Sequence, residues 1–337
     1  MITVGIIGAG RIGKVHTQSI VTQVPNAKIK TIADPFMNKE TERWAKNMGI
    51  KNVTKDYKDI LKDPEIDAVL ICSSTDTHSK ISIEAIQAKK HVFCEKPIDH
   101  DLAKIKKVVE ALKKSKVKYQ VGFNRRFDHN FEAVHNAVVA GKIGKPQLIK
   151  ITSRDPNPPS IDYVKVSGGI FLDMAIHDFD MVRFLAGCDA VEVYAAGAVL
   201  VDPAIGKAGD IDTAIITLKM KNGAIAVIDN SRKAVYGYDQ RAEVFGSKGM
   251  VACTNDSQSS AVISNENGVT GEKPLFFFLE RYIAAYAKEV KCFIDAIEKN
   301  KPTPLGVMDG LEPVRMGLAA KKSLKEHRPV KLSEIKF

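Results

Sequence analysis

Short apolar runs alternate with segments of helical periodicity over the first part of the chain. A short apolar run predicts a strand, and apolar residues spaced three or four positions apart predict a helix. Strands that alternate with helices of about 12 residues form parallel sheets, because each helix crosses over the sheet to the next strand. We therefore predict an α/β fold with a doubly wound parallel sheet of the Rossmann type. Its strands are expected at residues 2–7, 28–33, 68–72, 91–94 and 117–122, and its helices at residues 14–24, 37–48, 77–88 and 101–114.

The hydrophobic pattern changes after residue 123. Apolar runs now follow one another mostly without helices, and Asn222-Gly223 and residues 247–249 are typical hairpin turns. Consecutive strands predict a mainly antiparallel sheet, hence an α+β second domain. We expect domains at residues 1–123 and 124–337, with late helices that can pack back on the first domain. The strands are expected at residues 147–153, 190–200, 213–220, 224–231, 241–245 and 251–253, and the helices at residues 127–140, 278–299 and 310–326.

Composition limits the class of protein. The chain has 337 residues, 45% of them hydrophobic and 27% charged, which is typical of a globular protein with two domains. The apolar runs fall short of the ~20 residues that a membrane span needs, and the N-terminus lacks the pattern of a secretory leader. We therefore expect a cytoplasmic protein with no membrane partner. The 5 cysteines form no C-x-x-C pair, so neither disulfides nor a metal site are expected.

The formal net charge of +10 raises the question of an anionic partner. The lysines, however, lie on the polar faces of predicted helices, as in residues 101–114. No basic block carries interleaved aromatic residues, so we expect no nucleic-acid partner.

A glycine motif opens the first helix. Gly8, Gly10 and Gly13 form G-x-G-x-x-G between a predicted strand and a predicted helix, the context in which the motif indicates a dinucleotide site. The glycines allow a tight turn, close approach of a pyrophosphate, and close packing of helix on strand. Asp34 ends the second strand, where a carboxylate hydrogen-bonds the ribose hydroxyls of NAD and disfavours NADP; a simple turn role before Pro35 is the alternative. The cofactor-binding candidates from this region are Gly8, Gly10, Arg11, Ile12, Gly13 and Asp34.

Further candidates follow the carboxyl ends of predicted strands, the edge at which open α/β sheets bind their ligands. Lys96 follows a strand that is stopped by Pro97, so its ammonium group belongs to this edge. His78 lies near the start of a helix, where contact with the cofactor and a capping role are both open. The cofactor-binding candidates from this edge are Ser73, Ser74, Thr75, His78, Glu95 and Lys96.

One segment of the second part combines acid–base residues with an apolar stripe. Asp173 and His177 are four positions apart, so on a helix they share one face. A carboxylate beside an imidazole suits a general base. A surface salt bridge, half of a metal site and a buried structural histidine remain open. Gly168-Gly169 before the helix favours a functional role, because glycine permits close approach of the backbone to another body.

Three separated motifs then agree with one family: the glycine motif, Glu95-Lys96-Pro97, and G-G-x-x-x-D-x-x-x-H-D ending at Asp178. From Met1 to about Val330 the chain resembles the inositol dehydrogenase branch of the glucose–fructose oxidoreductase/inositol dehydrogenase (Gfo/Idh/MocA) family. One departure is Ala175, where many members have glycine; alanine is also small. Segments that resemble the inositol-acting members are residues 122–128, 154–159 and 236–246.

The resemblance implies a catalytic trio of Lys96, Asp173 and His177, with NAD(P), a large open sheet and a homotetramer. His177 would take the proton of a ring hydroxyl while hydride leaves the carbon, Asp173 would orient the imidazole, and Lys96 would hydrogen-bond the reacting oxygen. The substrate-binding candidates are Lys96, Arg126, Asp155, Asn157, Asp173, His177 and Tyr236.

The resemblance thus implies an NAD-dependent inositol 2-dehydrogenase activity on myo-inositol or scyllo-inositol. A dehydrogenase of another sugar or polyol is the alternative with the same chemistry. A non-catalytic NAD(H)-binding redox sensor is the alternative of another class, and it has no need for the three catalytic residues together.

Overall fold

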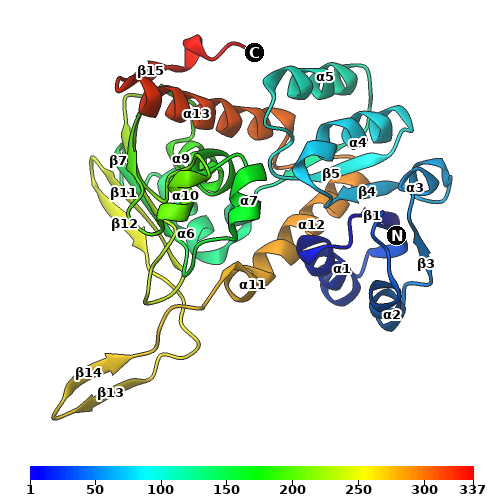
Figure 1. Ribbon diagram of the computed structural model, residues 1–337, viewed down its shortest axis with the longest axis horizontal. Coiled ribbons are helices and arrows are strands. Elements are labelled where there is room, and N and C mark those ends of the chain that lie inside the picture. Colours follow the sequence, from blue (N-terminus) through cyan, green and yellow to red (C-terminus); the bar gives the residue numbers. More distant parts are fainter. The chain divides into compact units, whose positions relative to one another are not determined.

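The computed structural model describes all 337 residues. The chain forms two compact units, labelled by element in Figure 1. The first contains Met1–Phe127, Ile283–Val314 and Phe337, and the second contains Asp128–Tyr282 and Arg315–Lys336. The first unit therefore includes a late segment of the chain as well as the predicted nucleotide-binding region.

The first unit is built on a parallel sheet, as the sequence pattern predicts. All of its neighbouring strands pair in parallel. The strand Asn52–Thr54 was missed, because three residues are too few to show a pattern. The strand order is β3 (Asn52–Thr54), β2 (Ala27–Ala33), β1 (Ile2–Ile7), β4 (Ala68–Ile71), β5 (His91–Glu95) and β6 (Tyr119–Gly122).

Side-chain caps set the start of several helices in this unit. Asn38 accepts a hydrogen bond from the Thr41 amide, and Asp101 accepts one from the Ala103 amide. Thr77 lies inside its helix and does not cap it, because its hydroxyl donates back to the Ser74 carbonyl at 2.7 Å. The helices are α1 (Arg11–Gln23), α2 (Lys39–Asn47), α3 (Lys58–Lys62), α4 (Thr75–Gln87), α5 (Leu102–Lys113), η1 (Asn124–Phe127) and α12 (Ile283–Glu298).

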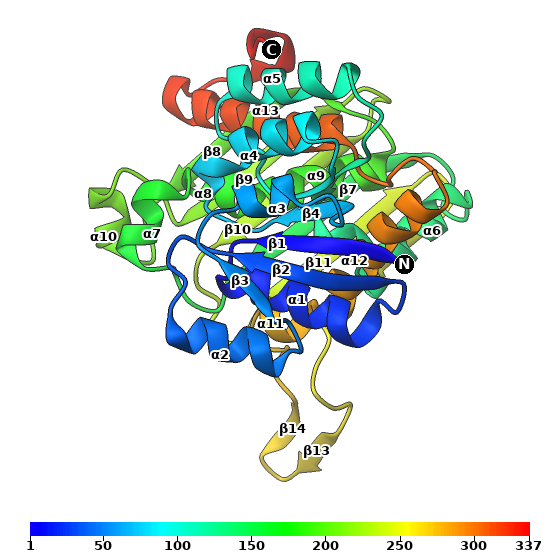
Figure 2. The same ribbon diagram turned by 90° about the vertical axis from the view of Figure 1, so that its right-hand side faces the viewer.

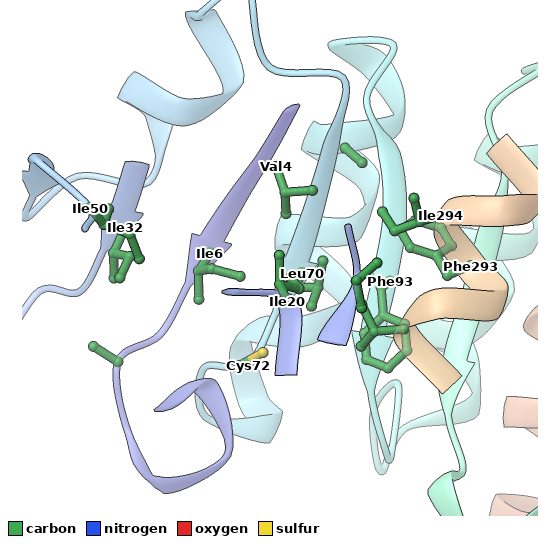
Figure 3. Close-up of a cluster of buried hydrophobic side chains, with 14 of the residues drawn as sticks. Val4, Ile6, Ile20, Ile32, Ile50, Leu70, Cys72, Phe93, Phe293 and Ile294 are labelled. Atoms are coloured by element: carbon green, nitrogen blue, oxygen red, sulfur yellow. The ribbon is translucent and has the colours of Figure 1, made fainter. Parts of the chain in front are cut away.

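The core of the first unit joins residues from both ends of the chain. Figure 3 shows Val4, Leu70 and Phe93 of the sheet together with Phe293 and Ile294 of α12. All five are fully buried. Burying each such side chain stabilises the fold by roughly 1.5–3 kcal/mol. Helix α12 is therefore an integral part of the parallel-sheet unit, although it follows the second sheet in sequence.

The second unit is built on a mixed sheet that is mainly antiparallel, as predicted. Strands β7 and β10 pair in parallel, and all other neighbours pair antiparallel. The predicted turns are confirmed: Gly223 and Gly249 have φ values of +91° and +151°, which favour glycine. The strand order is β12 (Gly249–Cys253), β11 (Asp239–Gly246), β7 (Pro146–Arg154), β10 (Ile225–Ser231), β9 (Thr213–Met220), β8 (Ala190–Ala198) and β15 (Val330–Lys331).

The two faces of the mixed sheet differ. Helix α9 packs against β7 and β10, and α6 packs against β11 and β12. Leu148 and its register neighbours Ile225 and Phe245 are about half exposed on the other face, so this face is open. The helices of the unit are α6 (His129–Val139), α7 (Ile161–Val166), α8 (Ile170–Asp173), α9 (Ala175–Ala186), α10 (Pro203–Lys207), α11 (Phe278–Arg281), η2 (Leu332–Glu334) and part of α13 (Val307–Glu326).

A separate hairpin of β13 (Val262–Asn265) and β14 (Gly268–Gly271) was not predicted. It extends away from the mixed sheet in both Figure 1 and Figure 2, and every residue of the two strands is exposed. The predicted helix at 278–299 is divided at Tyr282 into α11 and α12. No helix in the chain combines the length and the apolar character needed to cross a lipid bilayer.

The glycine motif makes a testable prediction about the fold. A Cβ atom at Gly13 would lie 2.0 Å from the Gly8 carbonyl oxygen, whereas one at Gly10 would meet nothing within 4 Å. We expect Gly13→Ala to lower the free energy of unfolding by roughly 3 kcal/mol, the upper range for overpacking. Gly10→Ala, the matched control at a helix N-cap, should cost at most about 1 kcal/mol. Urea unfolding of both variants measures the difference, and equal midpoints would contradict it.

Candidate active site

The glycine loop after β1 leaves one side open. Gly8 has a φ of +102°, and a Cβ there would lie 2.5 Å from the Cys72 carbonyl oxygen. Gly10 is exposed and precedes α1 without a side-chain cap. The first-turn amides of α1, which belong to residues such as Arg11 and Ile12, can therefore face an anionic group. The loop fits a pyrophosphate, since close packing at Gly8 and Gly13 fixes the loop and Gly10 leaves room for the ligand.

Asp34 follows β2 beside this loop. One carboxylate oxygen accepts a hydrogen bond from the Ala9 amide at 2.7 Å, and the other accepts one from the Phe36 amide at 2.8 Å. The Phe36 contact is the turn role that the sequence left open. The Ala9 contact places the carboxylate next to the glycine loop, where a ribose would follow the pyrophosphate.

His78 joins two of the predicted strand ends. It is buried, and its ring nitrogens lie 2.8 Å from the Pro97 carbonyl oxygen and 3.0 Å from the Ser73 carbonyl oxygen. Both nitrogens can donate only in the charged imidazolium. Burial opposes the charge, but Cys94 and the two carbonyl groups outweigh it and raise the pKa of His78 to about 9. His78 thus connects the segments that follow β4 and β5 and does not cap α4.

The side chains near His78 on this edge are less buried. Ser73 and Thr75 are half-buried and Ser74 is exposed. The Ser73 and Thr77 hydroxyls lie 2.6 Å apart, which links the loop to the first turn of α4.

Lys96 and Glu95 differ in environment although they are adjacent. Lys96 is half-buried and precedes Pro97 through a cis peptide bond. Glu95 is buried; its carboxylate lies 2.6 Å from His16 and also accepts a hydrogen bond from the Lys96 amide at 3.2 Å. The Glu95 carboxylate is therefore engaged inside the unit.

We expected Asp173 and His177 of the second unit to lie on one continuous helix, but they do not. Helix α8 ends at Asp173, and α9 begins after Met174. The His177 amide donates to the Met174 carbonyl at 3.3 Å, three residues back, so the helical turn is tightened here. Asp173 and His177 are both half-buried.

Two residues that sequence reasoning missed contact the Asp173 carboxylate. The Tyr163 hydroxyl donates to one oxygen at 2.8 Å, and the Arg232 guanidinium lies 3.5 Å from the other. Arg232 is 1% exposed and also lies 3.4 Å from Asp210. Neither residue belongs to a motif, and no spacing in the sequence relates them to Asp173.

The twin glycines before α8 approach another part of the same chain. A Cβ at Gly169 would lie 2.6 Å from the Asp210 carboxylate, which accepts the Ile170 amide. A carboxylate at a helix N-terminus is stabilising. Gly169 therefore leaves room for Asp210 to cap the helix, and Asp210 in turn lies 3.4 Å from Arg232.

The remaining substrate-binding candidates are spread over both units. Arg126 lies 3.3 Å from Asp309 in the first unit. In the second unit, Asn157 and Tyr236 line a groove of about 810 Å³ together with residues 270–276. The Asp155 carbonyl accepts the Ala234 amide at 2.7 Å.

The Tyr236 hydroxyl has partners on the open side of the sheet. It donates to Asp239 at 2.6 Å and accepts from Arg154 at 3.0 Å. Burial and then Asp239 raise the pKa of Tyr236, although the Arg154 contact lowers it. Asp173 and His177 are not among the residues that line the groove.

The chain is similar to known proteins over nearly its whole length. A myo-inositol 2-dehydrogenase of Thermotoga maritima is 49% identical over 332 residues, 98% of this chain and 99% of that protein. The uncharacterized oxidoreductase YrbE of Bacillus subtilis is 51% identical, over 98% of this chain and 96% of that protein. The solved structure of scyllo-inositol dehydrogenase from Lactobacillus casei, with bound cofactor NAD(H) and scyllo-inositol, has a TM-score of 0.92 and 31% identity, with 99% of both chains covered.

Two family models match separate parts of the chain. Residues 2–123 match the oxidoreductase family with an NAD-binding Rossmann fold (GFO_IDH_MocA), and residues 131–252 match the GFO/IDH/MocA C-terminal domain. The parallel sheet with its glycine loop, the mixed sheet, and relatives about half identical all agree. The chain therefore belongs to the GFO/IDH/MocA family of oxidoreductases.

Proposed function

We propose that this chain is an NAD-dependent inositol 2-dehydrogenase, which oxidises one ring hydroxyl of myo-inositol or scyllo-inositol to the inosose. The sequence identity of 49% to the Thermotoga enzyme, over 98% of the chain, carries this proposal. The NAD(H) and scyllo-inositol bound in the Lactobacillus relative support the same cofactor and substrate class. Residues 1–123 supply the cofactor site, and residues 124–337 supply the substrate-binding and oligomerisation domain.

The residues at the carboxyl ends of the parallel strands fit NAD. The glycine loop receives the pyrophosphate at the N-terminus of α1, with Gly10 leaving room for it. Asp34 receives the ribose hydroxyls, and Ser73, Ser74 and Thr75 border the remainder of the cofactor. When bound, NAD⁺ supplies the acceptor for the hydride.

Three side chains act on the hydroxyl that is oxidised. His177 takes the hydroxyl proton as general base. Asp173, held by Tyr163 and Arg232, keeps the imidazole in one tautomer. Lys96 hydrogen-bonds the oxygen as it becomes a carbonyl, a charge-assisted contact that favours the transition state. A neutral polyol needs several further hydrogen bonds, for which Arg126, Asp155, Asn157 and Tyr236 are our candidates.

We also propose a cytoplasmic homotetramer that forms through the open face of the mixed sheet. Leu148, Ile225 and Phe245 are neighbours in register on this face and are about half exposed. Ile215 and Met250 extend the same apolar surface. Exposed apolar patches of this kind mark protein–protein contacts.

The enzyme should reduce NAD⁺ faster with myo-inositol or scyllo-inositol than with glucose. We expect His177→Ala and Lys96→Met to slow turnover of the better inositol about 10²–10⁴-fold, because each removes a group that handles the reacting oxygen or its proton. Initial rates measured by NADH absorbance test both points. The exposed residues His129 and Lys113 supply the controls His129→Ala and Lys113→Met. Turnover within about threefold of wild type in both active-site variants would refute the assignment.

Asp34→Ser should relax the discrimination against NADP. The substitution removes the negative charge that faces the 2′-phosphate, so the kcat/KM ratio of NAD⁺ to NADP⁺ should fall at least about tenfold. Glu42→Ser, on the exposed side of α2, is the matched loss of a carboxylate. An unchanged ratio in Asp34→Ser would leave Asp34 with its turn role alone.

Leu148→Glu should break the assembly, because it places a charge at the centre of the apolar face. Light scattering is expected to show the mass falling from that of four chains of 36.9 kDa to that of one or two chains. Leu200→Glu, in an exposed position outside the strands, should leave the mass unchanged. A wild-type mass of a single chain would disprove the homotetramer.

A further inference from the structure

A second group of titratable side chains is buried in the first unit. His16 comes from α1, Glu95 from the end of β5, and Glu289 from α12. The exposed fractions are 0%, 7% and 0%. One nitrogen of the imidazole and one oxygen of each carboxyl group lie within 4.8 Å of one another. This cluster is not part of the proposed reaction, but it adjoins Lys96 in the chain.

Both carboxyl oxygens of Glu95 have hydrogen-bond partners. Its two oxygens contact His16 at 2.6 Å and the Lys96 amide at 3.2 Å. A Cβ atom at Gly122 would lie 3.0 Å from the same carboxyl group, so the neighbouring strand leaves Glu95 little space to move. The Glu95 carboxylate thus connects a histidine of α1 to the backbone of Lys96.

Glu289 is different, because neither of its carboxyl oxygens has a hydrogen-bond partner in the protein. Only its backbone is held, where the carbonyl accepts the Gln120 amide group at 2.8 Å. An ionised carboxylate is not stable in such a place unless it is paired. Burial, then Glu95, then Cys292 raise the pKa of Glu289 well above its usual range.

The titratable groups that face Glu289 come from four elements. They are His16 of α1, Glu95 of β5, Cys292 of α12 itself, and Cys72 after β4. Burial also raises the pKa of the Cys72 thiol, which is therefore uncharged. The neighbouring Glu95 carboxylate further disfavours a negative charge on Glu289.

A metal ion does not suit this geometry. The 2.6 Å contact between His16 and Glu95 is a direct hydrogen bond with a proton between the two atoms. Two ligand atoms on one tetrahedral zinc ion lie roughly 3.3 Å apart, given bonds of about 2.0 Å. His16 and Glu95 therefore share a proton in a direct hydrogen bond.

We propose that Glu289 is buried as an uncharged carboxylic acid, so that Glu95 remains the single charged carboxylate beside His16. His16 and Glu289 then act through Glu95 as positioning residues for Lys96. If Glu289 were ionised, two buried carboxylates would repel each other at close range, and Glu95 would be displaced from the Lys96 amide. The positioning role rests on the proposed catalytic use of Lys96; the uncharged state of Glu289 does not.

The charge state of Glu289 can be measured by unfolding. In the unfolded chain a glutamate ionises at a pKa of about 4.3. The native protein keeps the proton above that pH, so the wild type loses stability as pH rises, until Glu289 ionises in the native state. The neutral variant Glu289→Gln has no such loss.

We therefore expect the ratio of unfolding equilibrium constants, wild type over Glu289→Gln, to rise about tenfold per pH unit between about pH 5 and pH 7. Urea unfolding of the full chain at each pH measures the ratio. Glu289→Met, also uncharged, is expected to give the same slope and serves if the glutamine variant does not fold. A ratio independent of pH, or one divalent metal ion per chain in elemental analysis, would overturn the proposal.

Kinetics test the positioning role. Glu95→Ala removes the acceptor for the Lys96 amide, so kcat should fall about tenfold or more while KM for NAD⁺ stays within about threefold. Glu95→Gln keeps an acceptor oxygen and should restore most of kcat, and Glu289→Gln should retain it near pH 7. An unchanged kcat in Glu95→Ala would refute the positioning role. Failure of the proposed function is a separate outcome, because it appears as an unchanged rate in Lys96→Met.

Discussion

The parallel-sheet unit depends on how closely α1 packs against the loop after β1. The Gly8 carbonyl leaves no room for a side chain at Gly13, so the first turn of the helix lies directly on the loop. His16 is one turn further along α1 and reaches Glu95 at 2.6 Å. Glu95 in turn holds the amide of Lys96. The close packing of the glycine loop on α1 therefore also determines where the backbone of Lys96 lies.

A similar sequence of contacts holds Asp173 in the second unit. Gly169 allows the Asp210 carboxylate to reach the N-terminus of α8, and Asp210 lies against the Arg232 guanidinium. Arg232 reaches Asp173 from the other side. Arg232 is almost fully buried, and a buried guanidinium is stable only with partners of opposite charge. The ion pairs with Arg232 therefore hold the carboxylates of Asp173 and Asp210 in place.

The sequence predicted the strands that carry clear apolar runs, and it predicted which residues follow the carboxyl ends of the parallel strands. It allowed late helices to pack back on the first domain, but it could not show that α12 is such a helix, because an apolar stripe does not reveal which surface it covers. The break at Met174 was missed for a related reason: Asp173 and His177 fit a regular helix by spacing, and only packing tightens the turn. Short strands such as Asn52–Thr54 have too few residues to show a period.

Motifs also fail to predict the residues that hold a site in place. Asp210 and Arg232 are distant in sequence from Asp173, and Glu289 is distant from Glu95, while Tyr163 is 10 residues from Asp173. Each makes its contact through tertiary packing alone. Hydride transfer depends on placing the reacting groups to within a fraction of an ångström. Buried polar partners supply that accuracy, since they cannot leave without exposing an unpaired charge to an apolar interior. Asn157 and Tyr236 are exposed, so the same physical argument does not fix their positions as it does that of Asp173.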